Sequence, residues 1–258
     1  AIRGAELGAR VAIAEGAAVG GTCVNVGCIP SKLLLEAAAQ FHAGRTGFPS
    51  LAGEAQAAWE RAQARKGAVV ARLRQEKYLD VLAGYEGVTL LRGAAELLGA
   101  ERVRVGEAVV GARRVVLATG AAPALPPVPG LAEAGALTST SAMELKALPA
   151  SLIVLGAGAV GLELGQAFAR FGVRVSVLEA EARILPGEDP ELTRALADAL
   201  AAEGLELRAG ARVTGVTRDE TGYHLDVEQG GKEESLHAEQ LLVAAGRRPN
   251  TAGLGLEG

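Results

Sequence analysis

Apolar runs of strand length alternate with longer apolar stretches in the second half of the chain. Residues 151–155 form a short apolar run, which is followed by a glycine-rich turn and a stretch of helical length that reaches Phe171. A second short run covers residues 173–178 and ends at Glu179. A strand, a helix and a second strand in this order are typical of a βαβ unit with parallel strands. We therefore predict an α/β fold.

The pattern occurs twice in the chain. Residues 7–15 (LGARVAIAE) align with residues 171–179 (FGVRVSVLE), and each segment reads as a helix end, a Gly turn, an apolar strand and a final Glu. Residues 115–123 (VVLATGAAP) align with residues 241–249 (LLVAAGRRP), and each reads as an apolar strand that ends in a Gly turn. Because an internal repeat fixes the architecture, we predict two related α/β units in tandem.

The second unit carries a dinucleotide-binding pattern. Gly156, Gly158 and Gly161 form G-x-G-x-x-G between a strand and a helix, and Glu179 ends the next strand. Such glycines permit a tight turn and a close approach of pyrophosphate to the helix N-terminus, while the acid binds ribose hydroxyls. A plain tight turn between strand and helix is the alternative interpretation. The full context favours a dinucleotide site, and with it two Rossmann-like three-layer domains.

Aligning the two copies predicts the domain limits. The partner of Gly156 in the first copy would fall before residue 1, so we expect a fragment that lacks the first phosphate loop and is truncated at both ends. The first copy also contains an insertion with both cysteines. A proline-rich stretch after residue 122 is a stiff connector. We predict a first domain at residues 1–122, followed at residues 123–150 by a linker or return segment with little strand or helix signal. A second domain covers residues 151–250, and residues 251–258 start a return to the first domain.

Composition narrows the function classes. The formal net charge is −4, and the basic residues are scattered among acids, which argues against a nucleic-acid partner. No apolar run reaches the roughly 18 to 20 residues that a membrane span needs, and no leader peptide opens the chain, so we expect a soluble, cytoplasmic protein without a membrane partner. Two cysteines do not form a secretory disulfide framework; they are catalytic, metal-binding or incidental.

Both cysteines lie in GGTCVNVGCIPSK, residues 20–32. Cys23 and Cys28 are close enough for a disulfide if the backbone bends, and we expect Gly27 to supply that freedom. Pro30 suits the first turn of a helix that runs to about Ala43. A helix N-terminus favours a thiolate, so we expect a lowered thiol pKa. The alternative is a pair of buried structural thiols.

These motifs resemble those of the pyridine nucleotide-disulfide oxidoreductases. The resemblance rests on GGTCVNVGCIPSK, on Ala118, Thr119 and Gly120, on G-x-G-x-x-G with Glu163, and on G-R-x-P-N at residues 246–250. It covers essentially the whole chain. It implies that the first domain binds FAD and that the second binds NAD(P)H.

The resemblance also implies residue roles. Cys28 would be the thiol nearest the flavin, and Cys23 would exchange with substrate. Lys32 would lie near flavin N5 and pair with Glu163, which is physically sensible because a buried lysine without a partner is costly. Glu15 would hold the FAD ribose. The implied cofactor-binding set is Glu15, Gly21, Thr22, Lys32, Ala95, Thr119, Gly120, Gly156, Gly158, Gly161, Glu179, Val213 and Gly246.

The substrate is inferred from finer resemblances. Four stretches are similar to mercuric reductases: TCVNVGC, LRQEKYLDVL, LTSTSAMEL and GQAFARFG. Soft thiolates bind soft metal ions, so Cys23 and Cys28 could hold Hg(II) transiently as substrate. Glu179 and the run ILPGEDPE are closer to dihydrolipoamide dehydrogenase, which stays open as the alternative. Glu179 favours NADH, although Arg183 lies nearby in the sequence.

Two further expectations concern the whole protein and other classes. The resemblance implies a homodimer built by a C-terminal domain, without which the fragment turns over poorly. The candidate of another class is an NAD(P)H oxidase or peroxidase, or a non-catalytic dinucleotide-binding sensor. Proteins of these kinds more often carry one cysteine, or none, in place of the pair. His42, His224 and His237 show no metal-ligand spacing, so we assign them no role. Trp59, Tyr78 and Met143 are read as packing residues.

Overall fold

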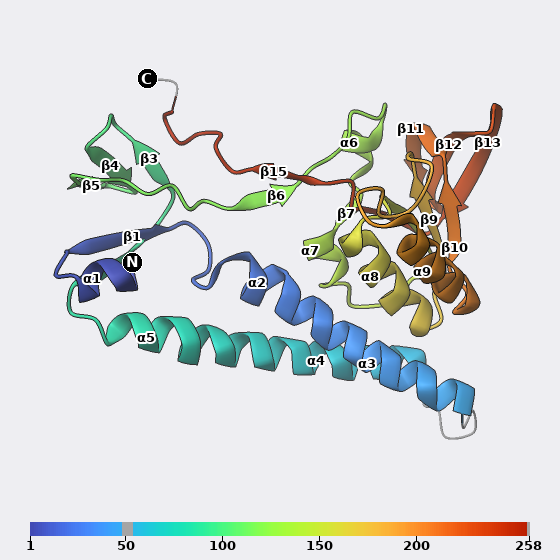
Figure 1. Cartoon of the computed structure of the whole chain (residues 1–258), viewed down its shortest axis with the longest axis horizontal. Helices are drawn as coiled ribbons and strands as arrows, with labels where there is room; N and C mark the ends of the chain where they lie inside the picture. The colour runs from blue at the N-terminus through green and yellow to red at the C-terminus, as the bar shows by residue number, and fades with distance from the viewer. Residues whose placement is uncertain (48–53, 257–258) are drawn as a thin grey trace. The chain divides into compact units, whose positions relative to one another are not determined.

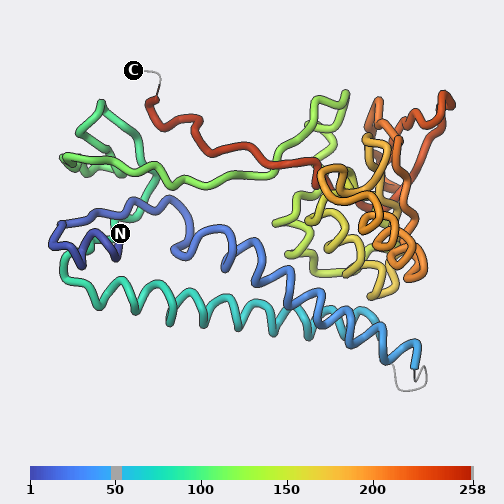
Figure 2. The backbone as a smooth tube through the Cα atoms, viewed as in Figure 1, coloured from blue at the N-terminus to red at the C-terminus, as the bar shows by residue number. Residues whose placement is uncertain are grey.

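The computed structural model describes residues 1–47 and 54–256, which fall into two compact units. Unit 1 consists of residues 1–29, 68–122 and 249–258, and unit 2 consists of residues 30–67 and 123–248. Figure 2 shows by its blue, teal-to-green and dark red segments that unit 1 is assembled from three separate parts of the chain.

Unit 1 begins with the short helix α1 (Ile2–Glu6) and the strand β1 (Val11–Glu15). Strand β1 pairs in parallel with β2 (Val88–Arg92), so that Glu15 lies opposite Arg92. A separate antiparallel sheet follows, in the order β3-β4-β5 (Ala95–Leu97, Arg102–Val105 and Ala108–Gly111). The remaining helical elements are α2 (Gly21–Val26), the start of α3 (Cys28–Gly47), the end of α4 (Ala55–Arg74), the π-helical turn η2 (Gln75–Leu79) and α5 (Asp80–Ala83).

The strand predicted at residues 115–119 does not form. This apolar segment joins no sheet of the described residues, and Val116 is 85% exposed. The sequence pattern supplies the apolar side chains of a buried strand, yet a strand also needs a neighbour that completes its backbone hydrogen bonds. In the described part of unit 1, the only parallel pair is β1 with β2. Beyond this segment, β6 (Ala121–Pro123) pairs with β15 (Arg247–Pro249).

Unit 2 is built on a five-stranded parallel sheet. Its strand order is β10-β9-β8-β14-β7, and the strands are Glu206–Ala209, Arg174–Glu179, Ser151–Leu155, Gln240–Val243 and Leu137–Thr138. The run predicted at residues 151–155 is therefore a central strand. Because successive strand residues point to opposite faces, Leu152 and Val154 join one hydrophobic cluster, while Ile153 and Leu155 join another.

These two clusters define three layers in unit 2 (Figure 1). On one face of the sheet, the first cluster includes residues of α8 (Ala159–Arg170) and α9 (Pro190–Ala202). On the other face, the second cluster includes residues of an antiparallel sheet ordered β11-β12-β13 (Ala211–Asp219, Gly222–Gln229 and Lys232–Ala238). This arrangement confirms the predicted α/β class with a parallel sheet.

Residues 30–67 group with unit 2, whereas the sequence analysis assigned them to the first domain. The physical reason is an aromatic cluster. The indole of Trp59 on α4 packs against Phe168 and Phe171, with ring centroids 5.3 and 5.4 Å apart, and Phe41 on α3 stacks on Phe171 at 5.5 Å. Trp59 is 1% exposed, and its Nε1 donates to the Leu145 carbonyl. Trp59 and Met143 are thus packing residues, as predicted.

Residues 123–150 contain more structure than their sequence indicated. Helix α6 (Leu131–Ala134), strand β7 and helix α7 (Ser139–Ala142) all lie in this segment, and β7 joins the main sheet of unit 2. A capping box at α7 was overlooked: the Thr138 side chain accepts from Ser141 N–H, and the Ser141 side chain accepts from Thr138 N–H. Its sequence signal is a Thr followed three residues later by a polar side chain. Among the described helices, none is long and apolar enough to cross a membrane.

Candidate functional site

The cysteine motif forms a compact turn at the junction of two helices. Cys23 lies on α2, Cys28 is the first residue of α3, and both are exposed thiols outside any disulfide, which argues against a pair of buried structural thiols. The two side chains share a hydrogen bond. Helix α3 starts at Cys28 and runs to Gly47, so it is longer at both ends than the predicted helix.

Gly27 permits this turn through space rather than through a left-handed conformation. Its φ is −130°, which lies outside the left-handed region. A Cβ at this position would lie 2.8 Å from the Thr22 carbonyl oxygen and 3.2 Å from the Cys23 Cα. Only a residue without a side chain therefore lets the backbone fold back on itself between the cysteines.

The thiol pKa differs from the prediction. The Cys28 thiol raises the pKa of Cys23, chiefly through the hydrogen bond between the two side chains, and desolvation adds to the increase. The backbone N–H groups of Cys28 and Ile29, at the start of α3, lower that pKa by a smaller amount. The predicted helix effect is thus present, but it is outweighed by the neighbouring thiol.

Lys32 and Glu163 form the predicted ion pair inside unit 2. Lys32 on α3 donates to the carboxylate of Glu163 on α8, with 2.5 Å between Nζ and Oε1. The Lys32 side chain is 60% exposed, so the argument from a buried lysine was wrong. An exposed ion pair of this kind contributes little to the stability of the fold. The feature of interest is that Lys32 lies four residues after Cys28.

The glycine-rich loop of unit 2 has the shape that a dinucleotide requires. A Cβ on Gly156 would lie 2.7 Å from the Ala244 oxygen, and a Cβ on Gly161 would lie 2.0 Å from the Gly156 oxygen. By contrast, a Cβ on Gly158 would meet nothing within 4 Å, and this residue precedes α8 without a side-chain cap. Crowding at Gly156 and Gly161 and open space at Gly158 fit a pyrophosphate at the helix N-terminus.

The two repeated acids have matching local geometry. Glu179 ends β9, and its Oε1 accepts from Glu181 N–H; Glu15 ends β1, and its Oε1 accepts from Ala17 N–H. The other oxygen of Glu179 accepts from Ala157 N–H in the glycine-rich loop at 2.8 Å. The repeat seen in the sequence thus extends to the same hydrogen bond, two residues after each acid. Both carboxylates fit the ribose-binding role.

A second group of motif residues gathers in unit 1. The Asn250 backbone N–H donates to the Gly120 oxygen at 3.0 Å, and the Asn250 side chain donates to the Thr119 oxygen at 2.9 Å. Gly120 has φ of +71°, and a Cβ there would lie 3.9 Å from the Thr22 hydroxyl. The structure therefore brings together three motifs that are far apart in the sequence.

The remaining predicted cofactor residues lie in varied local settings. Ala95 begins β3 and pairs with Val105, and Val213 lies on β11 beside a β-bulge. Gly246 has φ of +131°, and its oxygen accepts from Ala124 N–H. Gly21 has φ of +66° with open space where a Cβ would be.

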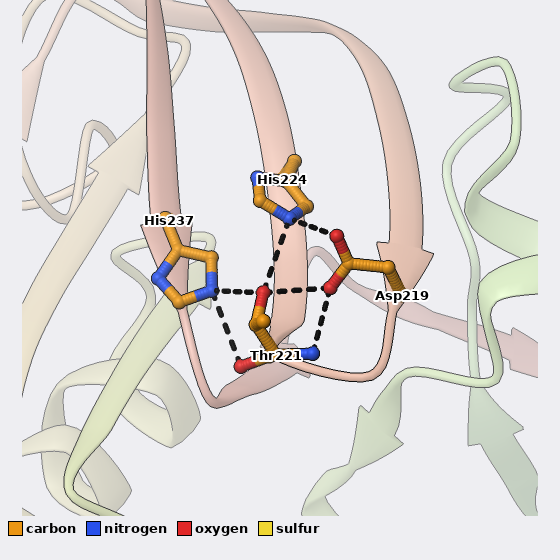
Figure 3. A network of polar contacts seen from close by, with 4 residues as sticks. All are labelled: Asp219, Thr221, His224 and His237. Carbon is orange, nitrogen blue, oxygen red and sulfur yellow. Dashed lines mark hydrogen bonds and ion pairs between the residues drawn. The ribbon is translucent and has the colours of Figure 1, made fainter.

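Two histidines without an assigned role meet on the β11-β12-β13 sheet (Figure 3). His224 and His237 lie opposite each other on β12 and β13, with ring centroids 4.7 Å apart. His224 contacts the Asp219 carboxylate at 2.9 Å, and His237 contacts the Thr221 hydroxyl at 3.2 Å. Within residues 1–47 and 54–256, no group of three or more His, Cys, Asp or Glu side chains is arranged to hold a metal ion.

Comparisons with known proteins agree with this geometry. Residues 1–258 match the family described as pyridine nucleotide-disulphide oxidoreductase. The chain belongs to that family. Members of the family use FAD and NAD(P)H, and the glycine-rich loop, Glu179 and Glu15 fit those cofactors.

The relatives carry more than one enzyme name. Over 261 residues, the chain is 39% identical to a mercuric reductase from Staphylococcus aureus, covering 100% of this chain and 47% of that relative. It is 42% identical over 268 residues to dihydrolipoyl dehydrogenase 3 from Pseudomonas aeruginosa, covering 100% of this chain and 57% of that relative. The chain thus spans about half the length of these relatives.

A solved structure supports the same assignment. The HOCl-induced flavoprotein disulfide reductase RclA from Escherichia coli is similar to this chain with a TM-score of 0.84 at 32% identity. The similarity covers 100% of this chain and 55% of that one.

Proposed function

We propose that this chain is the redox centre and nucleotide-binding part of an NAD(P)H-dependent flavoprotein disulfide oxidoreductase, with Cys23 and Cys28 as its working thiols. The observation that carries the proposal is the turn in which two exposed thiols share a hydrogen bond at the start of α3. Two thiols within reach of each other can cycle between dithiol and disulfide, which stores and releases two electrons.

Residues of this chain would hold the cofactors. Glu15 would bind the FAD ribose, and a wider group would line the FAD site: Gly21, Thr22, Ala95, Thr119 and Gly120. The NAD(P)H site would consist of Gly156, Gly158, Gly161, Glu179, Val213 and Gly246. When bound, FAD supplies the exchange between the hydride of NAD(P)H and the electrons of a disulfide. The family resemblance implies that Lys32, paired with Glu163, also contacts FAD.

We further propose that NADH is preferred over NADPH. The Glu179 carboxylate can accept hydrogen bonds from a ribose 2′-hydroxyl and would repel a 2′-phosphate. Arg183, the nearby cation that could compensate, donates instead to the carbonyl oxygens of Pro186 and Glu188. The guanidinium is therefore engaged within its own loop.

The substrate proposed is Hg(II), reduced to Hg(0). One NAD(P)H provides the two electrons that this reduction needs, and a pair of soft thiolates is suited to hold the ion. The mercuric reductases among the relatives support this choice. The dihydrolipoyl dehydrogenase at 42% identity supports the alternative, in which Cys23 exchanges with a dithiol or disulfide substrate. We also propose that the full-length protein is a cytoplasmic homodimer.

The substrate is tested on the full-length, FAD-loaded protein by following NAD(P)H oxidation at 340 nm with Hg(II) or with lipoamide as acceptor. We expect Hg(II) to support turnover at least about tenfold faster than lipoamide, a difference of about 1.4 kcal/mol in activation free energy. Cys23→Ser and Cys28→Ser should each abolish it. Faster turnover with lipoamide would replace mercury by a disulfide substrate, and full activity of both serine variants would overturn the role of the thiols.

A further inference from the structure

Asn25, which lies between the two cysteines, is the centre of a hydrogen-bond network inside unit 1. Its Nδ2 lies 3.2, 3.1 and 2.9 Å from the carbonyl oxygens of Ala18, Val19 and Gly21. The Ala18 and Val19 carbonyls belong to the loop that leads into α2, and Gly21 is the first residue of α2. The side chain therefore fastens the helix that carries Cys23 to the backbone that precedes it.

The acceptor end of the same amide binds an arginine from a distant part of the chain. Arg74 Nε donates to Asn25 Oδ1 at 2.8 Å, and both residues are half-buried. Within the described residues, Arg74 forms no ion pair with a carboxylate, so the amide is its recorded partner. A planar guanidinium fixes the direction of its partner more strictly than an ammonium group does.

Arg74 lies at a change in helix type. It is the last residue of α4, and the π-helical turn η2 begins at Gln75. Tyr78 in η2 lies 3.4 Å from the place that a Cβ would take on Gly20, the N-cap residue of α2. Single π-turns inside helices are frequent at functional sites. Here the turn places two side chains, Arg74 and Tyr78, against the cysteine-bearing segment.

We propose that Asn25 and Arg74 form a positioning pair that keeps the two thiols facing each other and thereby sets their thiol–disulfide equilibrium. A disulfide forms only when the Cβ atoms are about 3.5–4.5 Å apart. Holding the turn closed in the dithiol raises the effective concentration of one thiol at the other. The inference rests on the proposed redox role of Cys23 and Cys28, but its test needs neither flavin nor substrate.

The test equilibrates the chain with mixtures of reduced and oxidised glutathione at pH 7 and counts trapped thiols by mass. In this exchange, Cys23 and Cys28 lose two electrons and two protons to form one S–S bond, and one glutathione disulfide becomes two glutathione thiols. For Arg74→Gln and for Asn25→Ala, we expect the equilibrium constant for the internal disulfide to fall about tenfold, which corresponds to a potential about 30 mV less negative.

Matched controls separate positioning from charge and from general damage. Arg72→Gln removes an exposed cation two residues earlier on α4 and should leave the equilibrium constant unchanged. Arg74→Lys keeps the charge but loses the Nε donor, so it should resemble Arg74→Gln. The double variant Asn25→Ala with Arg74→Gln should shift the constant no further than either single change, because the pair acts as one unit.

The outcomes are distinguishable. A wild-type chain that never forms the internal disulfide would overturn the proposed function together with this inference. A wild-type disulfide whose equilibrium constant is unchanged in a folded Arg74→Gln chain, checked by circular dichroism, would overturn the inference alone. Wild-type behaviour of Arg74→Lys would overturn the requirement for a planar guanidinium at this position.

Discussion

At the scale of single residues, contact with the Cys28 thiol affects the pKa of Cys23 more than the N-terminus of α3 does. The shared hydrogen bond with Cys28 raises the pKa of Cys23, although amides at the start of α3 act in the other direction. In Cys28→Ala, the thiol that raises the pKa of Cys23 is removed, while the amides at the start of α3 remain. We therefore expect the pKa of Cys23 to fall, and the pH profile of its alkylation by iodoacetamide to move to lower pH. An unchanged profile, or one shifted to higher pH, would contradict this explanation.

Asp219 provides a second prediction at this scale. Its pKa is lowered from the ordinary 3.8 to about 2, first by the Thr221 hydroxyl, then by the Thr221 backbone N–H and by His224. A carboxylate with a lowered pKa stabilises the folded state above its unfolded pKa, and the contribution is lost as pH falls from about 4 through 2. Carboxyl NMR titration should give a midpoint near 2 for Asp219 and a higher one in Thr221→Val. A wild-type midpoint near 3.8 would show that the contacts in Figure 3 do not persist in solution.

At the scale of elements, the loop before α8 separates the structural and binding roles of its glycines. Gly161→Ala would place a Cβ 2.0 Å from the Gly156 oxygen, and we expect it to lower the free energy of unfolding by about 1–3 kcal/mol. Gly158→Ala meets open space, so its stability should change by no more than about 0.5 kcal/mol. Because the methyl group of Gly158→Ala would occupy the space of the pyrophosphate, we expect this variant to bind NADH about tenfold more weakly.

Urea unfolding and fluorescence titration with NADH measure these two effects. A stable Gly161→Ala chain would show that the loop can shift, and a Gly158→Ala chain with wild-type affinity would place the nucleotide elsewhere.

The same scale shows what sequence patterns could and could not predict. Strands β8 and β9 and helix α8 follow directly from apolar periodicity and the glycine spacing, because their burial is decided within one βαβ unit. The segment at residues 115–119 has a similar pattern but joins no sheet of the described residues, since periodicity reports which side chains are apolar and not whether a partner strand exists. The π-turn η2 and the Asn25–Arg74 bond left no recognised signal in the sequence.

At the scale of the whole molecule, the internal repeat predicted the α/β architecture and located the two repeated acids. It could not assign residues 30–67 to unit 2, because they lie outside the segments that repeat. Their grouping with unit 2 depends on Trp59, Phe168 and Phe171, aromatic residues whose contact is visible only in three dimensions. The ion pair of Lys32 with Glu163 was likewise implied by family resemblance rather than by spacing.

The central claim is that electrons from NAD(P)H reach the disulfide of Cys23 and Cys28. It is tested most directly by adding NADH without oxygen to the full-length, FAD-loaded protein and counting thiols that react with a disulfide dye. The account predicts that two thiols appear per chain on reduction, and that the gain is absent in Cys28→Ser. A flavin that becomes reduced while the thiol count does not rise would contradict it.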